Sequence, residues 1–127
     1  MVAGKRILVI DDEDDIREIA QLSLEMVAGW EVLTASSGGE GLQVASAGQP
    51  DVILLDVMMP EMDGPATFRQ LQADSSTKHI PVILLTAKVL SEDKRLFSDL
   101  GVSAIVSKPF DPMTLAADIA EALGWAE

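Results

Sequence analysis

The chain has 127 residues, no cysteine and a formal net charge of −12 at pH 7. This length suits one compact domain, and the lack of cysteine excludes thiol chemistry and disulfide staples. The excess of acid argues against direct contact with DNA or RNA, and no apolar stretch is long enough to span a bilayer. We therefore expect one soluble, cytoplasmic domain over residues 1–127.

Short, continuously apolar runs recur along the chain, which is typical of strands buried on both faces of a parallel sheet. The runs are Ile7–Ile10, Val32–Ala35, Val52–Leu55, Ile80–Leu85 and Ala104–Val106. Segments with helical periodicity lie between these runs. Strict alternation predicts an α/β fold, a single-domain doubly wound (βα)5 sandwich with helices on both faces of the sheet.

The first helical segment carries five residues on one face, which we expect to point inward. They are Ile16, Ile19, Ala20, Ser23 and Val27. Gly29 is expected to end this helix. Ser37 followed by Glu40 predicts a capping box at the start of the second helix.

The last three helices also carry start signals. Pro65 suits the first turn of the third helix, Ser91 can cap the fourth, and Gly101 can end it. Asp111 and Pro112 predict the N-cap and first residue of the fifth helix. The apolar residues expected on the inner faces are Phe68, Leu71, Leu96, Phe97, Leu100, Leu115, Ile119 and Leu123.

Reactive side chains follow four of the predicted strands. Asp11 and Asp12 come after the first strand, and Asp56 after the third. Thr86 and Lys108 come after the fourth and the fifth. Because ligands of such folds bind at the carboxyl ends of the strands, we expect these five side chains to share one edge of the sheet.

Three converging carboxylates repel one another, at a cost of roughly 4 kcal/mol for a pair about 4 Å apart at an effective dielectric near 20. Either the pKa values of Asp11, Asp12 and Asp56 rise or a cation lies among them, and oxygen ligands suit Mg²⁺. The next acids, residues 13–15, are interpreted as solvated residues favoured by the helix dipole.

Asp56 closes an apolar run, where a charge is costly unless it is paired. A carboxylate is also a competent nucleophile toward phosphorus. Thr86 can donate a hydrogen bond to a phosphoryl oxygen, and Lys108 can supply a positive charge. Each of these two residues alone would be unremarkable, so the hypothesis of phosphoryl transfer depends on their joint placement.

Four motifs in this order resemble the receiver domains of bacterial two-component response regulators along nearly the whole chain. They are "ILVIDDE", "DVILLDVMMPEMDG", "IPVILLTA" and "KPF". The resemblance implies the flavodoxin-like strand order 2-1-3-4-5. It also implies a phosphoryl donor that is a histidine kinase or a phosphotransfer protein.

The same resemblance assigns the site residues. It implies that Asp56 is the phosphoacceptor and that Thr86 and Lys108 contact the phosphoryl group. For Mg²⁺ it implies direct ligation by Asp12, Asp56 and the backbone carbonyl of Met58, with Asp11 acting through water. A cis peptide bond before Pro109 is implied as well.

Ile105 departs from the family pattern, which has tyrosine or phenylalanine three residues before this lysine. Ile105 is stiff and has no hydroxyl, so it cannot act as a swinging aromatic lever. We expect signalling through the Ala87–Leu90 loop to a downstream protein that binds the face of the fourth helix, fifth strand and fifth helix. The chain is expected to be a monomer or a weak, phosphorylation-dependent dimer.

Several alternatives to a stand-alone receiver stay open. The chain can be the receiver portion of a larger regulator or hybrid kinase. A haloacid-dehalogenase-type phosphatase would need a second acid where Met58 stands, and a flavodoxin would need a phosphate loop where the sequence has "DDEDD". A degenerate receiver would lack the complete set of site residues. Apart from self-phosphorylation and autodephosphorylation, we expect no enzymatic activity.

Overall fold

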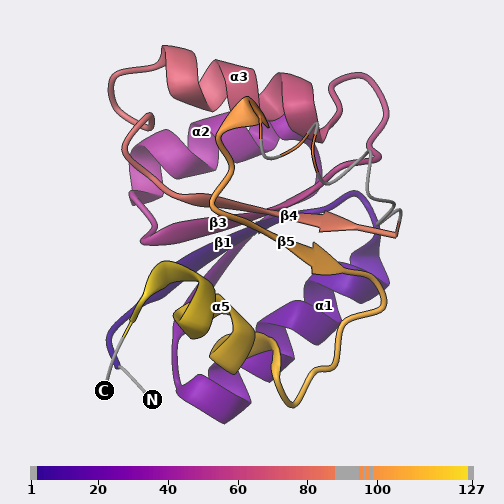
Figure 1. Cartoon of the computed structure of the whole chain (residues 1–127), viewed down its shortest axis with the longest axis vertical. Coiled ribbons are helices and arrows are strands. Elements are labelled where there is room, and N and C mark those ends of the chain that lie inside the picture. Colours follow the sequence, from indigo (N-terminus) through magenta and orange to yellow (C-terminus); the bar gives the residue numbers. More distant parts are fainter. Residues whose placement is uncertain (1–2, 88–94, 96, 98, 126–127) are drawn as a thin grey trace.

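The computed structural model describes residues 3–87, 95, 97 and 99–125, and it contains one parallel sheet of five strands in the order β2-β1-β3-β4-β5. The strands are β1 Arg6–Ile10, β2 Glu31–Ala35, β3 Val52–Asp56, β4 Val82–Thr86 and β5 Ala104–Ser107. The predicted strand order is therefore confirmed. β1 and β3 lie side by side near the centre of the sheet, and their carboxyl ends share one edge (Figure 1).

Helices cover both faces of the sheet, as predicted (Figure 1). They are α1 Asp14–Ser23, the π-helical segment η1 Leu24–Ala28, α2 Gly38–Gly48, α3 Gly64–Ala73 and α5 Leu115–Leu123. α1 and α5 pack on one face, and α2 and α3 pack on the other. No helix in the described ranges is long and apolar enough to cross a membrane. Ser91 and Leu96 of the predicted fourth helix lie outside the described residues, whereas Phe97 is buried.

The strands alternate between two cores because successive side chains point to opposite faces of the sheet. Ile7 and Val9 of β1 pack under α1 and α5, whereas Leu8 and Ile10 pack under α2 and α3. All four side chains are fully buried. Burial on both faces explains why the runs are continuously apolar.

The first helix differs from the prediction in its second half. Ala20 and Ser23 are buried as expected, but Ile19 and Val27 are exposed. The chain changes from an α-helix to a π-helix at Leu24, and a π turn holds more residues than an α turn. The α-helical spacing therefore no longer applies beyond Ser23, which accounts for Val27 but not for Ile19, which lies within α1.

Two other helix starts were only partly predicted. Ser37 caps α2 by accepting a hydrogen bond from the Glu40 N–H, but the Glu40 carboxylate bonds to Ser36 instead of closing the box on Ser37. The prediction that Asp111 caps the fifth helix is wrong, since α5 begins at Leu115. Asp111 instead accepts a hydrogen bond from the Met113 N–H and stabilises a turn over residues 112–114.

Candidate functional site

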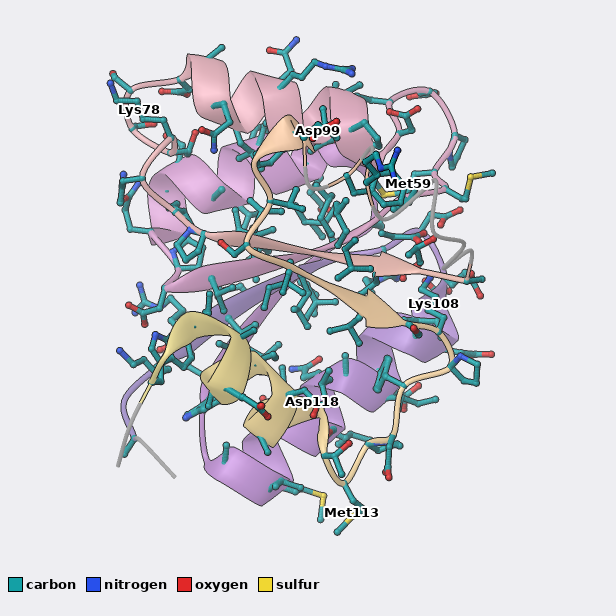
Figure 2. The ribbon with its side chains drawn as sticks, in the orientation of Figure 1. Met59, Lys78, Asp99, Lys108, Met113 and Asp118 are labelled. Atoms are coloured by element: carbon teal, nitrogen blue, oxygen red, sulfur yellow. The ribbon has the colours of Figure 1, made fainter. Side chains whose placement is uncertain are left out.

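Three buried or half-buried side chains meet at the carboxyl edge of the sheet. Asp11 directly follows β1 and is fully buried, and Asp56 is the last residue of β3 and is 3 % exposed. Lys108 follows β5 and lies near the strand end (Figure 2). The parallel sheet aligns these strand ends, so residues far apart in sequence become neighbours.

One ammonium group is shared among three carboxylates. Lys108 Nζ lies 2.8 Å from Asp11 Oδ2, 3.0 Å from Asp56 Oδ1 and 3.8 Å from Glu13 Oε1. Of these acids, Glu13 is exposed, whereas the other two are excluded from solvent. Among these groups the carboxylates outnumber the one ammonium, and two of the carboxylates are buried.

The pKa values at this edge reflect the crowding. Burial, reinforced by the charge of Asp11, raises the pKa of Asp56 to about 6, although the Lys108 ammonium and the Met58 N–H lower it. Burial opposes the charged form of Lys108, but its ion pairs with Asp11 and Asp56 outweigh burial and raise the pKa of Lys108. Lys108 is therefore charged at neutral pH, and Asp56 is mostly ionised.

The loop between β1 and α1 is held by its own polar contacts. Asp11 Oδ1 accepts a hydrogen bond from the Glu13 N–H at 2.9 Å. The Arg17 guanidinium donates to the backbone carbonyl of Asp11 at 2.7 Å and pairs with Asp14. Glu13 is exposed, as expected of a solvated acid, and one of its carboxylate oxygens also lies within 4.8 Å of oxygens of the other acids at this edge. Sequence reasoning did not identify Arg17, whose one signal is its place one turn into the helix.

Gly64 allows α3 to begin directly behind the acidic edge. A Cβ atom at Gly64 would lie 2.6 Å from the Asp56 carbonyl oxygen and 2.8 Å from Val57 Cα. Such contacts are too short for any side chain, so only glycine fits. The Gly64 N–H also donates to the Val57 carbonyl at 2.9 Å, which fixes the backbone that follows Asp56.

The remaining predicted site residues border the same edge. Thr86 is the last residue of β4, is buried, and accepts a backbone hydrogen bond from the Lys108 N–H at 2.9 Å. The Met58 side chain is exposed. The peptide bond between Lys108 and Pro109 is cis. Ile105 pairs with Leu84 in the sheet and packs against the core under α2 and α3.

The acidic residues of this edge fit a divalent cation. Asp11, Asp12, Glu13 and Asp56 each offer one oxygen, and these oxygens all lie within 4.8 Å of one another. Asp11 Oδ2 is buried and accepts no hydrogen bond of good geometry from the described residues. A cation with oxygen ligands would relieve the repulsion among these carboxylates and would give Asp11 Oδ2 a partner besides the Lys108 ammonium, which lies 2.8 Å away.

The fold and this edge agree with one protein family. The family model of the response regulator receiver domain matches residues 7–120. The chain belongs to this family. Receiver domains are the phosphoryl-accepting modules of two-component signalling, so this receiver domain is a signalling module of that kind. Its family also implies a histidine kinase or related phosphodonor.

Similar proteins extend the match in sequence and in structure. The alkaline phosphatase synthesis transcriptional regulatory protein PhoP of Bacillus subtilis is 40 % identical over 116 residues, which cover 91 % of this chain and 47 % of that protein. The phosphate regulon transcriptional regulatory protein PhoB of Pseudomonas aeruginosa is also 40 % identical, over 91 % of this chain and 50 % of that protein. The receiver domain thus spans about half the length of these relatives.

A solved structure matches over nearly its whole length. The chemotaxis protein CheY4 of Vibrio cholerae superposes with a TM-score of 0.87 at 32 % identity. The match covers 94 % of this chain and 99 % of CheY4. The five-stranded fold is therefore that of a chemotaxis-type receiver.

Proposed function

We propose that Asp56 accepts a phosphoryl group from a histidine kinase or phosphotransfer protein, with Mg²⁺ bound beside it, and that residues 1–127 form one receiver domain. The observation that carries the proposal is the buried carboxylate of Asp56, 3.0 Å from the Lys108 ammonium and inside a cluster of four acids. Apart from Asp11 and Asp56, the carboxylate residues in the described ranges are exposed to solvent.

In the proposed reaction, an oxygen of Asp56 forms a bond to phosphorus while the bond from phosphorus to the donor's imidazole nitrogen breaks. That nitrogen keeps the electron pair, and the product on the receiver is an acyl phosphate. Asp56 must be ionised to attack. Lys108 holds the attacking carboxylate in place beforehand and can pair with the phosphoryl oxygens afterwards.

Mg²⁺ would be held by Asp12, Asp56 and the backbone carbonyl of Met58, with Asp11 acting through water. When bound, the ion neutralises charge on the transferring group. Glu13 adds a further oxygen at the mouth of the cluster. Thr86 is buried at the end of β4, where its hydroxyl would donate to a phosphoryl oxygen.

Output is proposed to occur by a change in the partner-binding face formed by the fourth helix, β5 and α5. Most of the Ala87–Leu90 loop lies outside the described residues, so its predicted role stays a prediction. Ile105 is partly buried on β5 and cannot swing as a ring does. The remaining proposals are a cytoplasmic location, a monomer or weak phosphorylation-dependent dimer, and no enzymatic activity beyond self-phosphorylation and autodephosphorylation.

Mass spectrometry of the intact chain tests the central proposal. With Mg²⁺ and acetyl phosphate, the wild type should gain one phosphoryl group, and Asp56→Asn should gain none because an amide is a poor nucleophile. Asp51→Asn is a matched control at the other end of β3 and should be modified like the wild type. An unmodified wild type, or equal modification of Asp56→Asn, would contradict the proposal.

A further inference from the structure

Arg17 is a largely covered basic residue in the first turns of α1, close to the acidic edge. Its side chain is 19 % exposed, and two of its nitrogens make separate contacts. Nη1 donates to the Asp11 backbone carbonyl at 2.7 Å, and Nη2 pairs with the Asp14 carboxylate. Asp11 is the first residue of the loop between β1 and α1, and Asp14 is the first residue of α1. The guanidinium therefore links the two ends of this loop.

The contact with the Asp11 carbonyl restrains the backbone that leads into Asp12. This carbonyl belongs to the planar peptide unit that joins Asp11 to Asp12, so a hydrogen bond to its oxygen fixes the orientation of that unit. On its other side, the Asp11 N–H donates to the Ala35 carbonyl at the end of β2, at 3.1 Å. The Asp11 backbone is thus held by β2 at its N–H and by Arg17 at its carbonyl.

Asp12 depends on this restraint more than its buried neighbour does. The Asp12 residue is exposed, so packing does little to hold its side chain, yet one of its oxygens belongs to the cluster of four acids. Magnesium sites need near-ideal octahedral geometry, and loss of a group that orients a ligand typically lowers metal affinity by about 10–100-fold. The orientation of the peptide before Asp12 therefore affects how well this carboxylate can bind a cation.

The charge of Arg17 has the opposite effect on a cation. A positive charge near the acidic edge repels a cation, although its ion pair with Asp14 offsets part of that charge. The charge also reaches Glu40, whose pKa is lowered mainly by hydrogen bonds from Ser36 and to a smaller extent by Arg17. Removing the charge alone should therefore strengthen cation binding, whereas removing an orienting contact should weaken it. The sign of the change distinguishes the two roles.

We propose that Arg17 is a positioning residue that holds the loop between β1 and α1 in the conformation that presents Asp12 to Mg²⁺, an inference that rests on the proposed function of this edge. The planar guanidinium suits this role, because its nitrogens donate in fixed directions and reach two acceptors at once. A lysine ammonium would keep the charge but would lack the planar fork.

Calorimetric titration with Mg²⁺ tests the proposal, at a temperature where circular dichroism shows each chain to be folded. Arg17→Gln should bind Mg²⁺ at least about tenfold more weakly than the wild type. Arg17→Lys should bind it at least about threefold more weakly, because it keeps the charge and loses the fork. Arg69→Gln removes an equal charge from an exposed position on α3 and should change the affinity less than about twofold.

Hydrogen exchange measured by NMR tests the same role without Mg²⁺. The Glu13 amide donates to Asp11 Oδ1 and reports opening of the loop, whereas the Ile53 amide donates to the Pro81 carbonyl and reports opening of the sheet. In Arg17→Gln the exchange rate of Glu13 relative to that of Ile53 should rise at least about fivefold, because the loop opens more often than the fold does. In Arg69→Gln this ratio should match that of the wild type.

Four results would overturn the proposal. They are unchanged or tighter Mg²⁺ binding in Arg17→Gln, wild-type affinity in Arg17→Lys, equal losses in Arg17→Gln and Arg69→Gln, and an unchanged ratio of the two exchange rates in Arg17→Gln. Each of these leaves Mg²⁺ binding by the wild type intact and so removes only the role of Arg17. A wild type that binds no Mg²⁺ would contradict the proposed metal site and this proposal together, so the two failures are distinguishable.

Discussion

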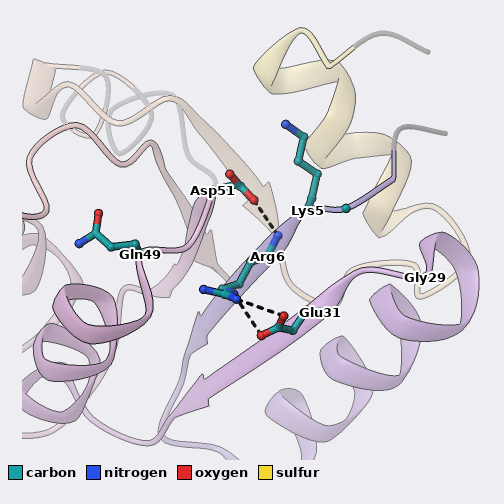
Figure 3. A pocket seen from close by; sticks show the side chains of 7 residues that line it. Lys5, Arg6, Gly29, Glu31, Gln49 and Asp51 are labelled. Atoms are coloured by element: carbon teal, nitrogen blue, oxygen red, sulfur yellow. Dashed lines mark hydrogen bonds and ion pairs between the residues drawn. The ribbon is translucent and has the colours of Figure 1, made fainter.

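Basic and acidic side chains pair at both ends of the sheet, but the two ends differ in how the charges are balanced and how deeply they are buried. At the amino end, the Arg6 side chain pairs with Glu31 at 3.0 Å, and the Arg6 N–H donates to the Asp51 carboxylate at 2.8 Å (Figure 3). Arg6 also donates to the Gly48 carbonyl. At the carboxyl end, Lys108 lies within 4 Å of carboxylate oxygens of Asp11, Glu13 and Asp56.

Burial separates the two ends further. The side chains of Arg6 and Glu31 are 42 % and 57 % exposed, whereas those of Lys108 and Asp11 are 11 % and 0 % exposed. Water screens the ion pair between Arg6 and Glu31, so this pair changes the free energy of folding little. At the carboxyl end the surplus negative charge is poorly screened. The two ends of the sheet therefore differ in both charge balance and burial, and the carboxyl end groups four acids that could hold a cation.

The apo chain should lose stability as the pH rises through about 6. The pKa of Asp56 is about 6 in the folded chain against 3.8 for a free side chain, so the folded state binds the proton more tightly. The stabilisation is full below pH 4 and is lost by pH 7, by up to about 3 kcal/mol. Urea unfolding of wild type and Asp56→Asn across this range measures the effect as a difference. Parallel pH profiles for the two chains would contradict it.

Asp12→Ala should lower the affinity for Mg²⁺ by at least about tenfold, since it removes a proposed ligand. The same change should raise the melting temperature without Mg²⁺, because it relieves carboxylate repulsion. Calorimetric titration and thermal melts measure both effects. Asp15→Ala removes an equal charge from the nearby first turn of α1, outside the cluster, and should change the affinity less than about threefold. Equal losses in both variants would show that only net charge matters.

Lys108→Ala should destabilise the chain by about 3–5 kcal/mol without Mg²⁺, because the buried carboxylates of Asp11 and Asp56 lose their shared partner. The fold and the Mg²⁺ site should persist, and saturating Mg²⁺ should remove most of the difference by supplying positive charge. Melts with and without the ion test this, with the exposed Lys78→Ala as control. Phosphorylation should no longer change partner affinity in Lys108→Ala. A full change in affinity would exclude the signalling role.

Glu31→Gln at the amino end should change the stability by less than about 1 kcal/mol, because the pair is exposed. Mg²⁺ affinity and phosphorylation should match those of the wild type. Repeating the melts, the titration and the mass measurement on this variant checks all three expectations. A change in Mg²⁺ affinity would show that the two ends of the sheet are coupled.

The sequence predicted the sheet more accurately than the helices. The strands are buried on both faces and are therefore continuously apolar, which made them easy to identify in the sequence. The one clear difference is that β4 begins at Val82 and not at Ile80. Helix faces depend on unbroken α-helical spacing, which η1 interrupts. Asp111 matched a cap pattern, yet the turn over residues 112–114 delays the start of α5. Local sequence patterns do not predict the π-helix or the delayed start of α5, because both depend on how these segments pack against residues distant in sequence.

By itself, the sequence determined which reactive groups stand at strand ends, since the order of Asp11, Asp56, Thr86 and Lys108 along alternating elements places all of them at one edge. Only the tertiary structure decided how these groups share charge. Lys108 contacts Asp11 at 2.8 Å and Asp56 at 3.0 Å, and these contacts join segments that are far apart in sequence. The position of the Glu13 carboxylate in the cluster and the hydrogen bond from Arg17 to the loop each depend on the rotamer of one side chain. The exposure of Ile19, Leu22 and Met26 likewise required the structure, because burial is a property of the packed chain and a residue's apolar character does not reveal whether a neighbour covers it.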